Sequence, residues 1–187
     1  MNLIERAKNI LLTPKTEWPV IAGETDTLSS LLTSYVLPLA AIPAVASLLS
    51  GLVISSAIGT QLAVTTAIIA YASAIISFVI VTYVVDFLAE KFKSEKDLNK
   101  SAQLVAYAST ASWVAGILTI VPVIGALASL AGGIYAIYLM YLGVGSMKKT
   151  PEDQKVVYLV IIFVVLIAAT ILIGSLLGML LLSSALM

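Results

Sequence analysis

Residues 156–182 read VVYLVIIFVVLIAATILIGSLLGMLLL, and none of them is charged. A helix that spans the hydrocarbon core of a bilayer needs about 20 mainly apolar residues. At a rise of 1.5 Å per residue this run would form a helix of about 40 Å, longer than a hydrocarbon core of about 30 Å. The run therefore predicts a membrane-spanning helix that tilts or protrudes from the bilayer.

Four further apolar runs come before it, over residues 28–54, 62–85, 104–121 and 124–147. Of the 187 residues 60% are hydrophobic and 11% are charged, whereas soluble domains have roughly 45–50% and about 25%. No polar stretch is long enough for a separate soluble catalytic domain. We predict an all-α, polytopic membrane protein of five transmembrane helices, forming one membrane domain over residues 1–187. Residues 1–27 are then a cytoplasmic amphipathic segment, and residues 28–187 are the five-helix bundle.

The segment over residues 2–12 has helical periodicity. Its apolar residues fall on one helical face and its polar residues, Glu5, Arg6, Lys8 and Asn9, on the other. This pattern predicts a short amphipathic helix that ends before Pro14, since the residue before a proline avoids the α region. The helix either lies in the membrane interface or packs on the protein's own cytoplasmic surface. Trp18 is expected to anchor the segment at the interface.

The charged residues are confined to three segments, residues 5–26, 86–100 and 148–155. With five spans, all three segments lie on the same side of the membrane. All ten Lys and Arg residues are in them, and positive residues stay cytoplasmic. We therefore expect a cytoplasmic N-terminus and an external C-terminus. The formal net charge of +0 argues against nucleic-acid binding.

The chain contains no His and no Cys. Zinc sites with nitrogen or sulfur ligands, haem, iron–sulfur clusters, thiol nucleophiles and imidazole bases all need one of these residues. We expect no cofactor, no catalytic residue and no metal site, and the protein is predicted not to be an enzyme.

Small residues recur at four-residue spacing inside the apolar runs, which allows close approach of helices. Packing within the bundle is the default interpretation, and homodimerisation through Gly174 and Gly178 is the alternative; the glycines expected at contacts are Gly51, Gly116, Gly132, Gly174 and Gly178. Prolines Pro38 and Pro43 should kink the first span. Pro122 should make a tight turn between the third and fourth spans.

A group of polar residues lies where the second and third spans leave the membrane. Asp86 and Glu90 share one face of the second span, and a stripe on the third span includes Lys100, Gln103 and Tyr107. Tyr141, near the end of the fourth span, could reach the same place. The six residues predict either a cytoplasm-facing cation or proton pocket, since oxygen ligands suit such ions, or a structural site. In the structural alternative Asp86 pairs with Lys100 or with a tyrosine hydroxyl.

Four short motifs occur in a recognisable order. They are Pro14-Lys-Thr-Glu-Trp18, Tyr35-Val-Leu-Pro38, Val105-Ala-Tyr-Ala-Ser-Thr110 before Trp113, and Lys149-Thr-Pro-Glu-Asp153. Together with the five runs they resemble the bacterial branch of the Yip family, membrane proteins named for interaction with Ypt/Rab GTPases. The resemblance covers essentially the whole chain and implies a bacterial inner-membrane protein with no established activity. The longer N-terminal region with an Asp-Leu-Tyr-Gly-Pro-type motif of eukaryotic members does not occur here, so Rab binding is not carried over.

Two functions remain open. The first is a non-enzymatic membrane scaffold, organiser or assembly factor that acts through helix and lipid contacts. Its partners would be membrane lipids, a second copy of the chain or other membrane proteins. The alternative is a small transporter or ion-coupled permease that uses the pocket around Asp86 and Glu90.

Overall fold

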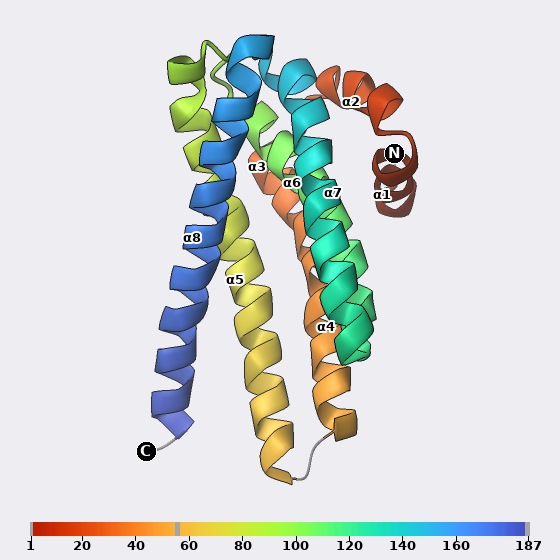
Figure 1. Cartoon of the computed structure of the whole chain (residues 1–187), viewed down its shortest axis with the longest axis vertical. Helices are drawn as coiled ribbons and strands as arrows, with labels where there is room; N and C mark the ends of the chain where they lie inside the picture. Colours follow the sequence, from red (N-terminus) through yellow and green to blue (C-terminus); the bar gives the residue numbers. More distant parts are fainter. Residues whose placement is uncertain (1, 55–56, 186–187) are drawn as a thin grey trace.

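The computed structural model of the chain describes residues 2–54 and 57–185, which are helical almost throughout (Figure 1). Two short helices, α1 (Leu3–Leu12) and α2 (Pro14–Ala22), come first. The first span consists of α3 (Leu28–Leu31), a π-helical turn η1 (Leu32–Val36) and α4 (Leu37–Ile54). Then follow α5 (Ala57–Ala89), η2 (Glu90–Phe92), α6 (Leu98–Ala115), η3 (Gly116–Ile120), α7 (Pro122–Lys148) and α8 (Glu152–Ala185).

Five helical segments are long and apolar enough to cross a membrane. They are Leu28–Leu52, Gly59–Phe92, Leu98–Ile120, Val123–Lys148 and Glu152–Met179. The predicted all-α fold with five membrane-spanning helices is therefore confirmed. The second segment starts before and ends after its predicted run, 62–85, and the fifth starts four residues before its run, because flanking polar residues continue the helical hydrogen bonding.

Pro38 is the second residue of α4, immediately after the Leu37 that caps the π-helical turn. In this turn the N–H of Leu37 donates to the carbonyl of Leu32, five residues back. The wider turn makes room for a proline ring, which clashes with the carbonyl four residues earlier in a regular helix. Pro43 lies inside α4. Pro122 is the first residue of α7, a position where the missing proline N–H has no intrahelical partner to lose.

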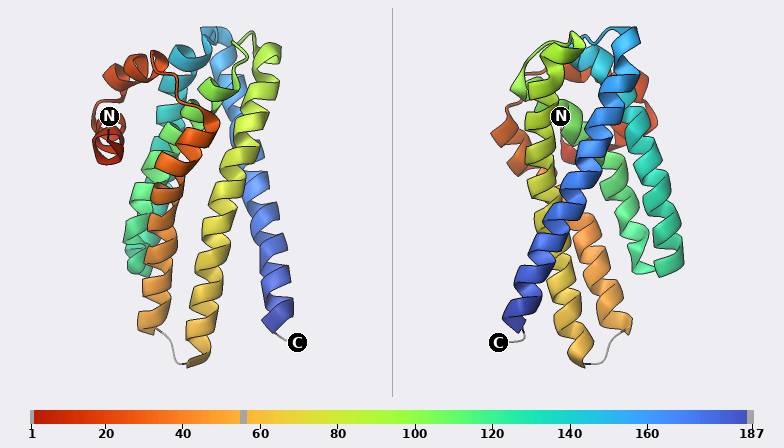
Figure 2. Two further views of the ribbon diagram at one scale, coloured as in Figure 1. Left: turned by 180° about the vertical axis from the view of Figure 1, so that it is seen from behind. Right: turned by 60° about the vertical axis from the view of Figure 1, so that its left-hand side comes forward.

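The α6 helix is the centre of the bundle. It packs against α7, α5 and α4, and its residues from Ser101 to Ala108 are all buried. The α8 helix, by contrast, lies at the outside, with most of its contacts to α5 (Figures 1 and 2). The outward faces of the spans are apolar, as expected for side chains in contact with lipid.

The glycines of the spans fall into two classes. A Cβ atom on Gly51 would lie 2.5 Å from Ala63 Cβ, one on Gly116 2.5 Å from Pro43 Cβ, and one on Gly132 2.6 Å from Ala115 Cβ. These three glycines allow neighbouring helices to touch. A Cβ on Gly174 or Gly178 meets no described atom within 4 Å, so neither glycine is at a contact within the bundle.

The N-terminal helices are packed on the protein. Ile10 and Trp18 are fully or almost fully buried, and α2 contacts α7 across the end of the bundle. This finding favours packing on the protein's own surface over a helix held only by the membrane interface. Two expectations need correction. Arg6 is buried instead of lying on a polar outer face, because it forms ion pairs with Glu17 and Glu24. Trp18 is packed beside Leu104 and Gly143 instead of anchoring at the interface.

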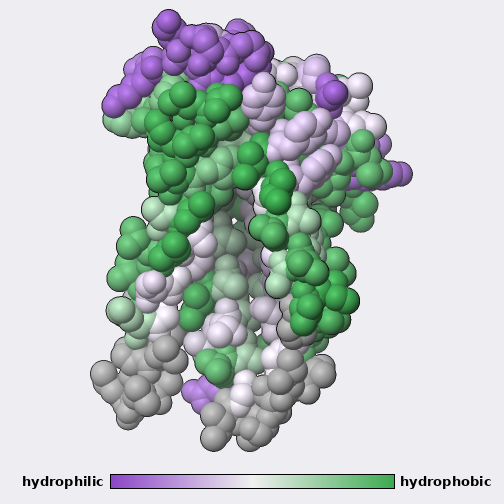
Figure 3. All heavy atoms as spheres, in the orientation of Figure 1, coloured by the Kyte–Doolittle hydropathy of each residue, from purple (hydrophilic) through white to green (hydrophobic). Residues whose placement is uncertain are grey.

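The three charged segments lie together at one end of the bundle, which we call the polar end (Figure 3). The two connections there are joined directly: the Glu95 N–H donates to the Lys148 carbonyl at 2.7 Å, and Ser94 Oγ lies 2.8 Å from Thr150 Oγ1. Lys149 Nζ pairs with Glu95 at 2.9 Å. The α5–α6 and α7–α8 connections therefore form one polar layer.

Candidate functional site

The structure does not bring the six predicted pocket residues into one site. The α6 helix stands between them and presents two different polar faces. One face carries Ser101 and meets Asp86 and Lys148. The other carries Lys100, Gln103 and Tyr107 and meets the N-terminal segment. The three residues therefore share one face of α6, as predicted, but this face contacts the end of α2 and the loop after it instead of α5.

Asp86 belongs to a compact network that we call the Asp86 network. Lys148 Nζ, which is completely buried, lies 3.4 Å from Asp86 Oδ1 and donates to Ser101 Oγ at 2.7 Å and to the Asp97 carbonyl at 3.1 Å. Ser101 Oγ is in turn 3.2 Å from Asp86 Oδ1. The cation that pairs with Asp86 is therefore Lys148, not Lys100. A buried ammonium with three oxygen partners is satisfied and stays in place.

Glu90 and Tyr141 lie outside this network. The α-helical part of α5 ends at Ala89, and the Glu90 side chain, 68% exposed, pairs with Lys96 at 3.5 Å. Tyr141 is partly exposed, and the ammonium of Lys155 lies 5.7 Å from the centre of its ring. Asp86 and Glu90 therefore have different partners and do not converge on a common cation position.

Lys100 and Gln103 hold the N-terminal segment. Lys100 Nζ donates to the carbonyls of Ala22 and Glu24 at 2.7 Å each, at the end of α2 where helical carbonyls lack intrahelical partners. Gln103 is completely buried and its Nε2 lies 3.4 Å from the Glu24 carbonyl. These contacts fix the turn after α2 against α6.

Arg6 is the central cation of this second face. Its guanidinium donates to Glu17 and to Glu24, and it lies 5.4 Å from the centre of the Tyr107 ring. Burial by itself lowers the pKa of Arg6, but the hydrogen bond and charge of Glu24, together with Tyr107 and Glu17, raise the pKa above its ordinary value. Arg6 therefore keeps its charge, and removing it would take the cation from the buried Glu17 carboxylate and from the partly exposed Glu24 carboxylate.

A polar cavity of about 430 Å³ adjoins Arg6, and we call it the Arg6 cavity. The Tyr107 hydroxyl donates to Asp26 at 3.2 Å, and Tyr35 packs edge-on against Tyr107 with ring centres 4.8 Å apart. Tyr35 also exchanges a 2.8 Å hydrogen bond with Thr110. The lining residues come from α1, the 23–26 loop, the start of the first span and α6: Leu3, Arg6, Gly23, Glu24, Thr25, Asp26, Leu31, Ser34, Tyr35 and Tyr107.

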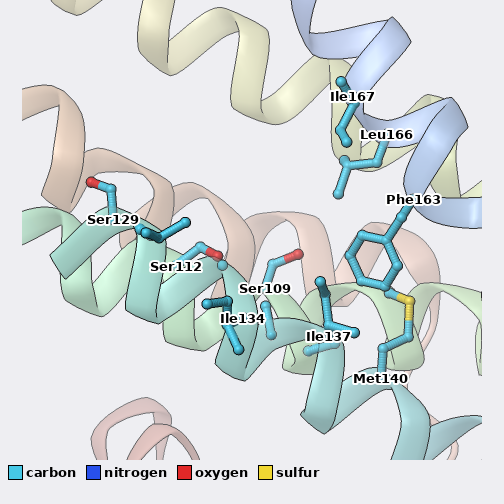
Figure 4. Close-up of a pocket in the computed structure, with 13 residues that line it drawn as sticks. Ser109, Ser112, Ser129, Ile134, Ile137, Met140, Phe163, Leu166 and Ile167 are labelled. Carbon is cyan, nitrogen blue, oxygen red and sulfur yellow. The ribbon is translucent and has the colours of Figure 1, made fainter. Parts of the chain in front are cut away.

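A second hollow lies inside the membrane-spanning part, between α6, α7 and α8, with a volume of about 320 Å³. Figure 4 shows Phe163 and Leu166 of α8 facing Ile137 and Met140 of α7 across it. Three serines, Ser109, Ser112 and Ser129, also line it, and the Ser109 hydroxyl donates to the Val105 carbonyl at 2.8 Å. The groove is therefore an apolar space with little polar function.

Sequence reasoning missed Arg6, Glu17, Glu24, Asp26 and Lys148 as site residues. One signal was present for the first four, since four carboxylates and three cations are concentrated in residues 5–26 of a chain that is otherwise poor in charge. The sequence did not distinguish Lys148 from the adjacent Lys149 as the buried lysine. The exact residue at which α7 ends decides which of the two side chains points into the protein.

The described residues hold no group of three or more acidic side chains placed to bind a metal ion. The two faces of α6 contain ion pairs and hydrogen bonds. These interactions hold the N-terminal segment, the α5–α6 connection and the α7–α8 connection against one helix.

A comparison with protein families finds the Yip1 domain over residues 8–173. The chain belongs to the Yip1 domain family. Together with the five apolar helices, this match makes it an integral, multi-pass membrane protein of that family. Searches of curated proteins and of solved structures gave no match.

Three of the four short motifs quoted from the sequence contribute residues around the Arg6 cavity. Glu17 and Trp18 come from the first motif, Tyr35 from the second, and Tyr107 and Thr110 from the third. In the structure Tyr35 contacts both Tyr107 and Thr110, and Glu17 pairs with the Arg6 guanidinium, which lies over the Tyr107 ring. The motifs thus build the wall of the Arg6 cavity and its support.

Proposed function

We propose that this Yip1-domain protein is a non-enzymatic membrane scaffold or organiser of the bacterial inner membrane, with its polar end in the cytoplasm and its C-terminus outside. Its partners are membrane lipids, a second copy or other membrane proteins, which it contacts through helix surfaces. The observation that carries this proposal is that the buried and partly buried cations already have partners within the protein. Arg6, Lys100 and Lys148 each bind oxygen atoms of the protein itself.

The exposed faces support the same proposal. The α8 helix presents an apolar side to the surroundings along most of its length, including Val160, Val164, Ile167 and Ile171. Gly174 and Gly178 lie on this helix without a contact inside the bundle, and small residues at this spacing permit a close helix–helix contact. Such a surface suits association within the bilayer.

The orientation follows from the position of the charges. All Lys and Arg residues belong to the three segments at the polar end, and the positive-inside rule assigns that end to the cytoplasm. Reporter fusions at the C-terminus test this: alkaline phosphatase should be active there and a cytoplasm-only reporter inactive. The opposite pattern would overturn the orientation.

The transporter alternative is tested by flux. Purified protein in liposomes is assayed for proton, monovalent cation and small-solute movement, with wild type beside Asp86→Asn and the exposed control Glu90→Gln. We expect no flux above protein-free vesicles for any of the three, because Asp86 is held by Lys148 and Ser101. Flux in wild type that Asp86→Asn abolishes would overturn the scaffold proposal.

A further inference from the structure

The Arg6 cavity lies where the first span enters the membrane. Two of its lining residues, Glu24 and Asp26, come just before the span that starts at Leu28. Two others, Leu31 and Tyr35, are within the first two turns of that span, and Tyr107 is in the third span. The rim of the cavity is therefore at the depth of lipid headgroups and its floor is inside the bilayer.

The charges around the cavity do not balance. Three carboxylates, Glu17, Glu24 and Asp26, meet two cations, Arg6 and Lys100. Arg6 is shared by Glu17 and Glu24, so Asp26 has a hydroxyl partner, Tyr107, but no cation partner among the described residues. Within that part of the chain, one negative charge is left without compensation beside a cavity, in a region where the effective dielectric constant is below that of water. Such a site attracts a monovalent cation.

Among the residues that line the cavity, the buried side-chain atom without a hydrogen-bond partner in the described part of the chain is an acceptor. Glu24 Oε2 is buried and has no partner among the described residues, and the same is true of Oε1 of the completely buried Gln103. Gln103 does not line the cavity, but its Nε2 lies 3.4 Å from the carbonyl of Glu24, which does. Buried acceptors without a donor cost about 1–3 kcal/mol each, so the missing partner is a hydrogen-bond donor.

A donor with a positive charge meets both requirements. A primary ammonium group has three N–H donors and one positive charge, whereas a quaternary ammonium has the charge but no donor. An anionic glycerol headgroup has hydroxyl donors but no positive charge. The depth of the cavity favours a headgroup in the bilayer over a soluble amine.

We propose that the Arg6 cavity binds the primary ammonium headgroup of a membrane lipid, with the carboxylates of Asp26 and Glu24 as its acceptors. This inference rests on the proposed function only in that lipids are partners of the protein. Transport activity, tested through Asp86 on the other face of α6, would leave it standing.

Native mass spectrometry of the full-length purified protein measures the binding. Phosphatidylethanolamine, phosphatidylcholine and phosphatidylglycerol with identical acyl chains are titrated separately. We expect phosphatidylethanolamine to bind at least about tenfold more tightly than the other two, since one charge-assisted hydrogen bond is worth that factor. Equal affinity for the three lipids would overturn the proposal.

The variants locate the site. Asp26→Asn should reduce the preference below about threefold while the asparagine oxygen still accepts from Tyr107. Glu90→Gln makes the same chemical change at an exposed acid of the same end and should keep the preference in full. Glu24→Gln is the second site variant, and thermal unfolding shows that each variant is folded. A preference that survives both Asp26→Asn and Glu24→Gln in folded protein would overturn the site.

Free ethanolamine separates the lipid from a soluble amine. We expect it to compete with phosphatidylethanolamine only weakly, because it lacks the anchoring acyl chains. If ethanolamine binds wild type as tightly as the lipid does, the lipid assignment is wrong.

Discussion

The two polar faces of α6 use charge in different ways. On one face Lys148 is completely buried and gathers Asp86, Ser101 and a carbonyl around a single ammonium. On the other face Arg6 is shared between two carboxylates, a third carboxylate has no cation partner among the described residues, and a cavity remains. On the first face the charges are paired, whereas the second face has a cavity and an excess of negative charge. Charged residues inside a membrane protein therefore do not by themselves indicate a binding site. The better indication is a charge or a hydrogen-bonding atom that has no partner within the protein.

The largest effect is expected for Arg6→Met. The change leaves Glu17, only 8% exposed, without its cation, and Glu24 also loses its partner. Breaking a buried ion pair from one side costs about 3–5 kcal/mol, so the free energy of unfolding in detergent should fall by this amount.

Thermal and denaturant unfolding, followed by tryptophan fluorescence, measure this loss through Trp18 and Trp113. The double variant Arg6→Met/Glu17→Met removes the orphaned carboxylate and should recover part of the stability. A single variant within about 1 kcal/mol of wild type would contradict the central role of Arg6.

Lys148→Met should have a smaller effect. Asp86 loses its cation but keeps Ser101, and its side chain is 16% exposed, so water still reaches it. We expect a loss of about 2–3 kcal/mol.

The matched control is Lys149→Met. Its ammonium is 76% exposed and pairs only with Glu95, so the change should stay within about 0.5 kcal/mol. Equal effects of the two lysine variants would mean that burial of Lys148 contributes nothing.

The smallest effect concerns packing under the N-terminal segment. A Cβ on Gly143 would lie 2.6 Å from Trp18 Cζ2 and 2.7 Å from Leu104 Cδ1. Gly143→Ala should therefore cost about 1–2 kcal/mol through overpacking. Gly174→Ala, at a position with no described neighbour within 4 Å, should cost nothing. The same unfolding assay compares them, and a larger loss for Gly174→Ala would point to a contact of α8 with another molecule.

The fold could be predicted because one property, apolar length, decides it. We could predict the spans from the run 156–182 and the four runs before it without knowing how the helices pack. Each run corresponds to one apolar helix long enough to cross a membrane. Periodicity also grouped Lys100, Gln103 and Tyr107 correctly, since they share one helical face.

The partners of that face could not be predicted in the same way. A sequence of helices shows which residues share a side of one helix, but not how each helix is rotated about its axis. The rotation of α6 turns Lys100 toward Ala22 and Ser101 toward Asp86, so neighbouring residues in the sequence serve opposite sites. Arg6 was hidden for a related reason: next to Glu5 and Lys8 it reads as part of a solvated face, although its ion pairs make burial possible.

The burial of Trp18 has a consequence for how the protein is made. Its neighbours Leu104 and Gly143 belong to the third and fourth spans, and Lys100 holds the end of α2 from 78 residues away. During synthesis the N-terminal segment leaves the ribosome long before either span exists. In that interval its apolar residues, Ile10 and Trp18 among them, lack the side chains that bury them in the folded protein. The N-terminal helices can therefore reach their final packing only after the third and fourth spans have been made.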